Sequence, residues 1–222
     1  MTQRFVPECP FSVGKPNALT EVRIVGDDGR DVASGELGEI WLRSRAPKRL
    51  FLNAPEVNAR LLADGWHRTG DLARFDERGE VQFFDRKVDT LSIRGKLVSS
   101  LELECLVLEH PAVREAAVVG VRQHAGDSQV VAFVALRDPS GLPTLQQFVA
   151  ERVPPEHRPH RIISVMALPR THNGKVLKRE LRLDANIALS RQANGSGILH
   201  HDDAALRAPL LASSGSTKVL LP

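Results

Sequence analysis

Two uninterrupted apolar runs in the second half of the chain set the strongest limit on its fold. They are residues 116–121 (AAVVGV) and 130–137 (VVAFVALR). Apolar residues without polar alternation are typical of strands that are buried on both faces. The second run stays strongly apolar for only seven residues, whereas a helix that spans a bilayer needs roughly 20. The runs therefore predict interior strands of a soluble domain and no membrane segment.

Helix signals and shorter strand signals surround these runs. Ser100 is a residue type that caps helices, and Pro154-Pro155 end the second helical pattern. The resulting β-α-β-β-α-β-α order favours a small α+β domain with a three-stranded sheet and helices. In chain order, the predicted elements are a strand at 90–94 with a hairpin partner at 97–98, a helix at 100–109, the two apolar strands, a helix at 145–153, a strand at 161–168 and a short helix at 178–183.

The two ends of the chain have different patterns. The first part has short alternating strands between turn residues, which predicts an antiparallel sheet or a partial barrel. Its predicted elements are strands at 21–25 and 38–43, a helix at 55–63, a loop at 65–71, and a hairpin of strands 72–75 and 80–84. Residues 184–222 lose periodicity, and we expect mostly a disordered tail. Residues 200–203 (HHDD) are either a metal cluster or solvated; we expect no metal site, because adjacent side chains rarely converge on one ion.

Composition and charge exclude several classes of function. The chain is 42% hydrophobic, enough for a core, and its net charge of +3 is too small to predict nucleic acid or an anionic membrane as partner. Cys9 and Cys105 lie far apart, so we expect neither a disulfide scaffold nor a structural zinc site. This cysteine usage fits a reducing compartment, and the first 14 residues lack the apolar run of a signal peptide, so we expect a cytoplasmic protein.

Three stretches of the sequence together resemble one enzyme family. They are GWHRTGD at 65–71, DTLSIRGKLVSSLELECLVLEHPAVREAAVVGV at 89–121 and LPRTHNGKVLKREL at 168–181. In this order and spacing they are similar to the adenylate-forming (AMP-binding) enzymes, which include acyl-CoA synthetases, nonribosomal peptide adenylation domains and luciferases. The resemblance runs from about Ser12 to Leu183 and covers only the last part of a family member.

The resemblance implies an α+β fold class with two parts. These are the end of an antiparallel β-barrel-like subdomain and a small α+β lid domain with a three-stranded sheet and helices. Residues 1–84 would be the last strands of the large AMP-binding domain, and 85–89 would be the hinge. Residues 90–183 would be the mobile C-terminal lid domain, with the tail at 184–222.

The same resemblance implies nucleotide-binding roles for Asp71 and Arg86. A carboxylate in a tight loop can accept hydrogen bonds from both hydroxyls of a ribose. A guanidinium is a rigid fork that suits phosphate or ribose oxygens. Structural alternatives stay open, because Asp71 could be a turn residue and Arg86 could form a surface ion pair with Asp85 or Asp89.

Two further positions are implied for the moving parts. The hinge is expected at Val88, where family members usually have Asp or Lys, or at Asp89 if the alignment is shifted by one residue. Gly95 would line a tunnel for the pantetheine of CoA, because a missing side chain lets a thin ligand pass along the backbone. The alternative for Gly95 is a simple hairpin turn at Gly95-Lys96.

Lys175 is the residue for which the resemblance implies catalysis. The matching lysine of the family bridges the carboxylate substrate and the α-phosphate of ATP during adenylation. A preorganised cation lowers the barrier when two anions must meet. Residues 169–183 carry five basic residues against one acidic residue, so a solvated basic helix end is the alternative.

The implied function is that of the C-terminal portion of an ATP-dependent acid–CoA ligase. A carboxylate and ATP would give an acyl-adenylate and pyrophosphate, and CoA would then give acyl-CoA and AMP. The phosphate loop, the acyl pocket and the Mg2+ ligands of the family would lie outside this sequence, so we expect no activity from it alone. Two alternatives stay open: a non-catalytic binding module or split subunit that pairs with a separate large domain, and a fragment of a nonribosomal peptide adenylation domain.

Overall fold

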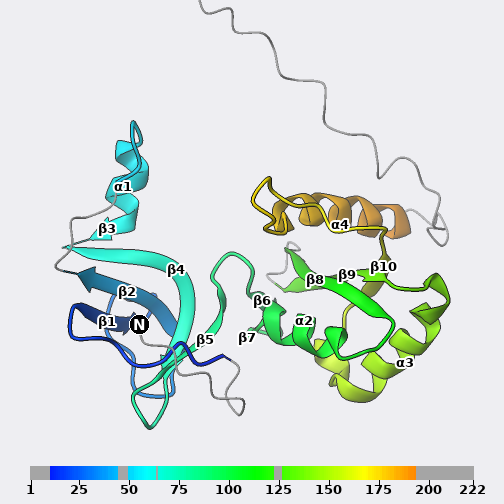
Figure 1. Cartoon of the computed structure of the whole chain (residues 1–222), viewed down its shortest axis with the longest axis horizontal. Helices are drawn as coiled ribbons and strands as arrows, with labels where there is room; N and C mark the ends of the chain where they lie inside the picture. Colours follow the sequence, from blue (N-terminus) through cyan, green and yellow to red (C-terminus); the bar gives the residue numbers. More distant parts are fainter. Residues whose placement is uncertain (1–10, 45–49, 64, 123–126, 194–222) are drawn as a thin grey trace, which may run out of the picture.

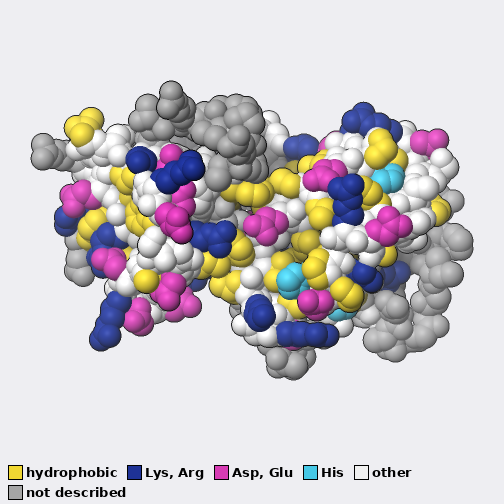
Figure 2. All heavy atoms as spheres, turned by 90° about the horizontal axis from the view of Figure 1, so that it is seen from below, with side chains coloured by type: hydrophobic (Ala, Val, Ile, Leu, Met, Phe, Trp, Pro, Cys, Tyr) yellow, Lys and Arg dark blue, Asp and Glu magenta, His cyan; other side chains and the backbone are white. Residues whose placement is uncertain are grey.

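The chain forms two units that are joined by the segment around residue 88 (Figure 1). The computed structural model describes residues 11–44, 50–63, 65–122 and 127–193. None of the helices in these ranges is long and apolar enough to cross a bilayer. On the face shown in Figure 2, basic and acidic side chains are interspersed over both units.

The first unit is an open antiparallel sheet of five strands. Its strand order is β1-β2-β4-β3, β5 pairs with β4, and the described strands do not close into a barrel. Alternation along the strands separates two apolar faces, one around Ile24 and Ile40 and the other around Trp41 and Trp66. The elements of this unit are β1 (Thr20–Val25), β2 (Gly38–Ser44), α1 (Pro55–Leu61), β3 (Leu62–Ala63), β4 (Trp66–Phe75) and β5 (Val81–Arg86).

The second unit is a three-stranded sheet with helices on both faces (Figure 1). β9 lies in the centre, antiparallel to β8 and parallel to β10. A separate two-stranded hairpin, β6–β7, precedes α2. The elements are β6 (Leu91–Ile93), β7 (Lys96–Val98), α2 (Ser100–Leu108), β8 (Val113–Arg122), β9 (Ser128–Leu136), α3 (Leu142–Arg152), β10 (Arg161–Ser164), α4 (Lys178–Ala193) and short 3-10 turns at Pro139–Gly141 and Pro155–His157.

The central strand β9 explains why its sequence is a continuous apolar run. Val130 and Val134 pack on one face against apolar residues of α2 and α3. Val131 and Phe133 pack on the opposite face against α4. Both faces are therefore covered, as the sequence predicted, and the mixed α+β class is confirmed.

Several predicted boundaries are wrong. Residues 65–71 are not a loop, because residues 66–71 belong to β4. The helix predicted at 55–63 ends at Leu61, because residues 62 and 63 pair with β4 as strand β3. The N-cap residue of α2 is Ser99 and not Ser100, because the Ser99 side chain accepts a hydrogen bond from the backbone N–H of Glu102.

The end of the described chain is also longer than predicted. α4 continues to Ala193, so residues 184–193 are not a tail. Ala185 and Ala188 are buried on the same side of α4 as Leu181, which explains why the helix continues. The remainder of the predicted tail, with residues 200–203, lies outside the described residues. β10 ends at Ser164, four residues earlier than predicted.

Candidate functional site

Thr69-Gly70-Asp71 forms a bulge in β4 that takes Asp71 out of the ladder with β2 while it stays paired with β5. Arg68 lies opposite Trp41 and Leu72 lies opposite Glu39, so the three residues between them face the single residue Ile40 of β2. The Thr69 hydroxyl donates to the Ile40 carbonyl at 2.8 Å and accepts the Asp71 N–H at 3.1 Å. Bulges commonly re-aim a side chain next to a functional site.

Gly70 allows this bulge because its φ is +73°, in the left-handed region. A Cβ at this position would meet no atom within 4 Å, so the backbone conformation is the main cost of a substitution. We expect Gly70→Ala to lower the free energy of unfolding of the first unit by about 1–2 kcal/mol. Urea titration followed by the fluorescence of Trp41 and Trp66 measures the change. Gly70→Asn is the control, because Asn enters this region more readily; an equal loss in both variants would contradict the explanation.

Asp71 and Arg86 lie opposite each other on β4 and β5. The Arg86 Nε is 2.8 Å from Asp71 Oδ1, but this buried oxygen has no aligned hydrogen-bond donor among the described residues. Burial raises the pKa of the Asp71 carboxyl; Arg86 lowers it and Glu39 raises it further. The pair therefore joins a carboxylate that is partly exposed, with its Oδ1 buried, to a half-exposed guanidinium.

Glu39 is a member of this site that the sequence did not indicate. Its Oε1 accepts the N–H of Gly70 at 3.1 Å, and its Oε2 lies 3.7 Å from Lys87 Nζ. The only local signal is a polar residue within the alternating strand GEIWLR. Its role in holding the bulge depends on the pairing of β2 with β4, which local sequence does not reveal.

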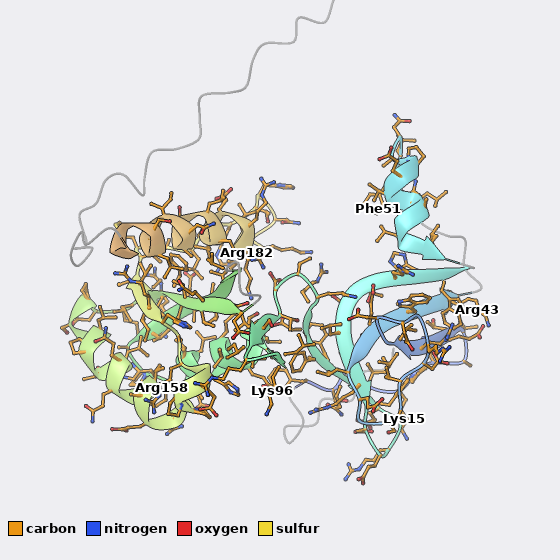
Figure 3. All side chains as sticks on the ribbon, turned by 180° about the vertical axis from the view of Figure 1, so that it is seen from behind. Lys15, Arg43, Phe51, Lys96, Arg158 and Arg182 are labelled. Atoms are coloured by element: carbon orange, nitrogen blue, oxygen red, sulfur yellow. The ribbon has the colours of Figure 1, made fainter. Side chains whose placement is uncertain are left out.

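Val88 lies between two anchors that belong to different units. On the first unit, the Lys87 N–H donates to the Gly70 carbonyl at 2.8 Å, and the Lys87 amine lies 2.8 Å from the Asp27 carboxylate. On the second, Arg182 of α4 donates to the Val88 carbonyl at 2.8 Å and pairs with Asp89 (Figure 3). Val88 itself is 74% exposed. This arrangement is compatible with a hinge at Val88 and Asp89, which stays a prediction.

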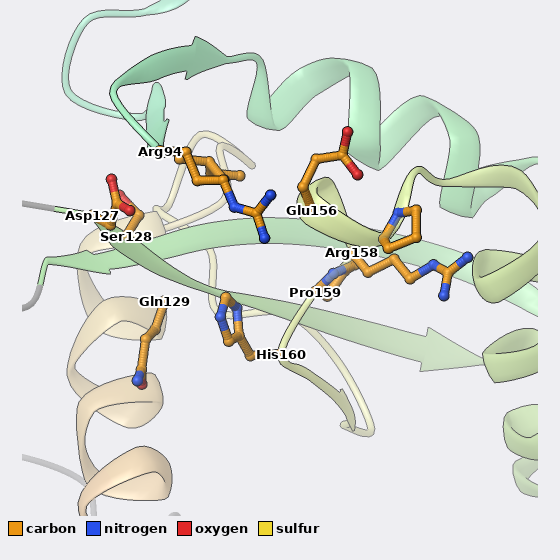
Figure 4. A pocket seen from close by; sticks show the side chains of 10 residues that line it. Arg94, Asp127, Ser128, Gln129, Glu156, Arg158, Pro159 and His160 are labelled. Carbon is orange, nitrogen blue, oxygen red and sulfur yellow. The ribbon is translucent and has the colours of Figure 1, made fainter.

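Gly95 lies in the β6–β7 turn, beside a cavity of about 470 Å3. The turn residues are Arg94 and Gly95, both with positive φ, and not Gly95-Lys96 as predicted. Arg94, Arg158 and His160 line the cavity together with two carboxylates (Figure 4). Because both charge signs are present, the lining by itself indicates no single class of ligand.

Lys175 lies in a tight loop between β10 and α4. Thr171 holds the Lys175 backbone through its own N–H, which donates to the Lys175 carbonyl at 2.8 Å, and through Oγ1, which accepts the Lys175 N–H at 3.0 Å. Arg170 donates to the Gly174 carbonyl at 2.7 Å and pairs with Glu115 of β8 at 2.6 Å. The backbone is fixed while the lysine side chain is exposed. The loop leads into the end of α4 that lies nearest the first unit (Figure 1).

The structure thus brings Asp71 and Arg86 together and places Gly95 and Lys175 on two separate loops of the second unit. Among the described residues, no group of three His, Cys, Asp or Glu side chains could hold a metal ion.

Comparisons with known proteins agree on one family. Residues 102–175 match the AMP-binding enzyme C-terminal domain. A long-chain-fatty-acid–CoA ligase of Escherichia coli O157:H7 is 33% identical over 183 residues, which cover 82% of this chain and 33% of that protein. The chain therefore spans about a third of the length of the curated relatives that it matches.

Solved structures give the same result. An amide bond synthetase from Marinactinospora thermotolerans is 35% identical with a TM-score of 0.69, and the match covers 79% of this chain and 37% of that one. An O-succinylbenzoate coenzyme A synthetase from Bacillus subtilis, in complex with ATP and magnesium, is 29% identical with a TM-score of 0.71, over 79% of this chain and 36% of that one.

Proposed function

This chain belongs to the adenylate-forming (AMP-binding) enzyme family, as a C-terminal portion, and we propose that it serves an ATP-dependent acid–CoA ligase. In this proposal residues 1–84 correspond to the last strands of the large AMP-binding domain, 85–89 to the hinge and 90–183 to the lid. A carboxylate oxygen attacks the α-phosphorus of ATP and pyrophosphate leaves. The thiol of CoA then attacks the acyl carbon and AMP leaves.

The observation that carries this proposal is the Asp71–Arg86 pair at the bulge of β4, in which a partly exposed carboxylate lies beside a half-exposed guanidinium. Ribose hydroxyls are donors that match the Asp71 carboxylate, and its charge makes such hydrogen bonds stronger than neutral ones. We assign a contact with the nucleotide to Arg86 as well, because its guanidinium is half-exposed and its Nε lies 2.8 Å from Asp71 Oδ1. The bulge and Glu39 fix the backbone on which this pair lies.

Lys175 and Gly95 both lie on the lid and act in different half-reactions. Lys175 acts in adenylation, and Gly95 acts in thioester formation. The Lys175 amine binds the carboxylate substrate and the α-phosphate together, and its fixed backbone limits the reorganisation that this needs. Gly95, with no side chain in the hairpin turn, leaves room for the pantetheine arm of CoA. The carboxylic acid itself is selected by a large AMP-binding domain.

A second candidate for the acceptor is an amine. The match to an amide bond synthetase, at 35% identity, favours it specifically. The adenylation step and the roles of Asp71, Arg86 and Lys175 are the same in both cases. Supplying the acyl-adenylate with either CoA or an amine separates the two acceptors by their products.

The test uses Asp71→Asn in an enzyme reconstituted from this chain and the large AMP-binding domain of a relative. We expect AMP to bind about 10- to 100-fold more weakly, because charge-assisted hydrogen bonds to the ribose are lost. Isothermal titration calorimetry measures the change. Since burial raises the pKa of Asp71, AMP binding to the unaltered enzyme should weaken as the pH falls through that raised value, and the variant should lack this dependence.

Asp28→Asn is the matched control, because Asp28 is an exposed carboxylate in the turn after β1. Its AMP affinity should equal that of the unaltered enzyme. Unchanged affinity in Asp71→Asn, or an equal loss in both variants, would refute the assignment of Asp71 to the ribose.

A further inference from the structure

A row of buried polar side chains crosses from the first unit to the second, and the proposed ligase steps do not use it. It begins at Asp85 on β5, which pairs with Leu72 of β4 in the first sheet. Asp85 Oδ2 accepts hydrogen bonds from the backbone N–H and from Oγ of Ser100, at 2.6 and 2.8 Å. Ser100 is the first residue of α2, and the two residues are 3% and 0% exposed. The contact between the units is therefore shielded from water.

The row continues from Ser100 to α4 and β8. Lys178 Nζ donates to Ser100 Oγ at 2.9 Å and lies 2.6 Å from Glu104 Oε1. The same Glu104 oxygen accepts the Val118 N–H of β8 at 2.8 Å. The positive end of the α2 dipole also faces the Asp85 carboxylate. A buried polar network that is satisfied in this way rigidifies the parts that it joins.

These contacts hold the two units together in addition to the covalent segment around Val88. Asp85 precedes Val88 and Ser100 follows it, so any rotation of the second unit about Val88 changes the distance between their side chains. A second link runs beside the first, because Ser99 Oγ donates to the Phe84 carbonyl at 2.8 Å. Both links must break if the second unit turns as a body while Phe84 and Asp85 stay in their sheet.

We propose that Asp85, Ser100 and Lys178 form a latch that holds the second unit in the orientation seen here and that opens when this unit rotates. The inference goes beyond the ligase function, because the latch acts in the chain itself with no nucleotide bound. Its hydrogen bonds are exchanged for hydrogen bonds to water on opening, so the closed and open orientations differ by a modest free energy.

The test measures the orientation of the two units in the free chain. Spin labels are attached to cysteines introduced at the exposed positions Glu77 and Gln146, in a background with Cys9→Ser and Cys105→Ser. Electron–electron double resonance then gives the distribution of distances between β4–β5 and α3. The unaltered latch should give one narrow distribution.

Ser100→Ala and Asp85→Asn should each raise the population at other distances by about tenfold. The double variant should raise it by less than the two single effects combined, because both substitutions weaken the same connection. Ser100→Ala removes the hydroxyl donor and leaves the backbone N–H of residue 100 to donate to Asp85. The matched control is Ser128→Ala, which removes a buried hydroxyl that accepts the Ser92 N–H within the second unit. The control should keep the narrow distribution.

Distributions in Ser100→Ala and Asp85→Asn that are as narrow as in the unaltered chain would overturn the latch. So would a control that broadens to the same extent. If Asp85→Asn fails to fold, Ser100→Ala still decides, because it removes a single oxygen atom and adds no volume. The outcome is independent of AMP binding, so the latch and the ligase function can fail separately.

Discussion

Lys175→Ala is expected to slow pyrophosphate release about 100- to 1,000-fold in an enzyme reconstituted from this chain and a large AMP-binding domain. The amine is the group that we assign to the carboxylate and the α-phosphate at once, and alanine leaves that charge uncompensated. The variant should fold normally, because the Lys175 side chain is exposed and the loop is held by backbone contacts to Thr171. Pyrophosphate release with ATP and a panel of carboxylates measures the effect.

Measuring thioester formation separately shows whether Lys175→Ala impairs adenylation alone or the enzyme as a whole. With the acyl-adenylate supplied, Lys175→Ala should form the thioester at nearly the unaltered rate, because adenylation is then bypassed. Lys15→Ala is the matched control, an exposed lysine of the first unit that should affect neither step. Equal losses in both half-reactions of Lys175→Ala would contradict the assigned role.

Sequence periodicity was sufficient to predict an element where burial alone determines its pattern of apolar residues. The apolar runs of β8 and β9 are buried on both faces, so their pattern is set by burial alone and was predicted correctly. The hairpin of β4 and β5 was also predicted, because its turn residues mark the reversal of the chain. Motifs singled out Asp71, Arg86 and Lys175, and their roles stay predictions. The ion pair of Arg86 with Asp71 was not predicted, because Asp85 and Asp89 were the partners considered for Arg86.

Long-range partners explain what the sequence did not reveal. The TGD motif was taken for a loop, because its bulge depends on Glu39 and Ile40 of another strand. The extension of α4 depends on small residues such as Ala185, which are buried only because the sheet lies beneath them. Ser100 read as a helix cap, whereas its side chain joins Asp85 to Lys178. Local pattern cannot indicate such contacts.

The second large effect is expected at Glu104, which forms an ion pair with Lys178 of the latch. Glu104→Ala should lower the free energy of unfolding of the second unit by about 3 kcal/mol. It leaves the ammonium of Lys178, whose side chain is 17% exposed, without its carboxylate, and it leaves the Val118 N–H without an acceptor. Urea unfolding followed by far-ultraviolet circular dichroism, with hydrogen exchange of the β8 amides, measures the loss.

Two comparisons show whether the unpaired buried charge is the cause. Glu109→Ala also removes an ion pair at α2, with Arg152, but both side chains are more than half exposed, so its loss should stay below about 1 kcal/mol. Glu104→Gln combined with Lys178→Met removes both charges and keeps an acceptor for Val118, so it should destabilise less than Glu104→Ala. A loss in Glu109→Ala as large as in Glu104→Ala would refute the explanation.

The pH dependence gives an independent test of the same site. Burial raises the pKa of the Glu104 carboxyl above its usual value, and this outweighs the lowering by Lys178. The folded state therefore holds the Glu104 proton more tightly than the unfolded state does, so the contribution of this group to stability is lost as the pH rises through the raised pKa. The difference in unfolding free energy between the unaltered chain and Glu104→Gln should fall as the pH rises from the usual pKa of a glutamate carboxyl to the raised pKa of Glu104. Above the raised pKa the difference should level off. A difference that rises with pH there would show that Lys178 outweighs burial, and the raised pKa would be wrong.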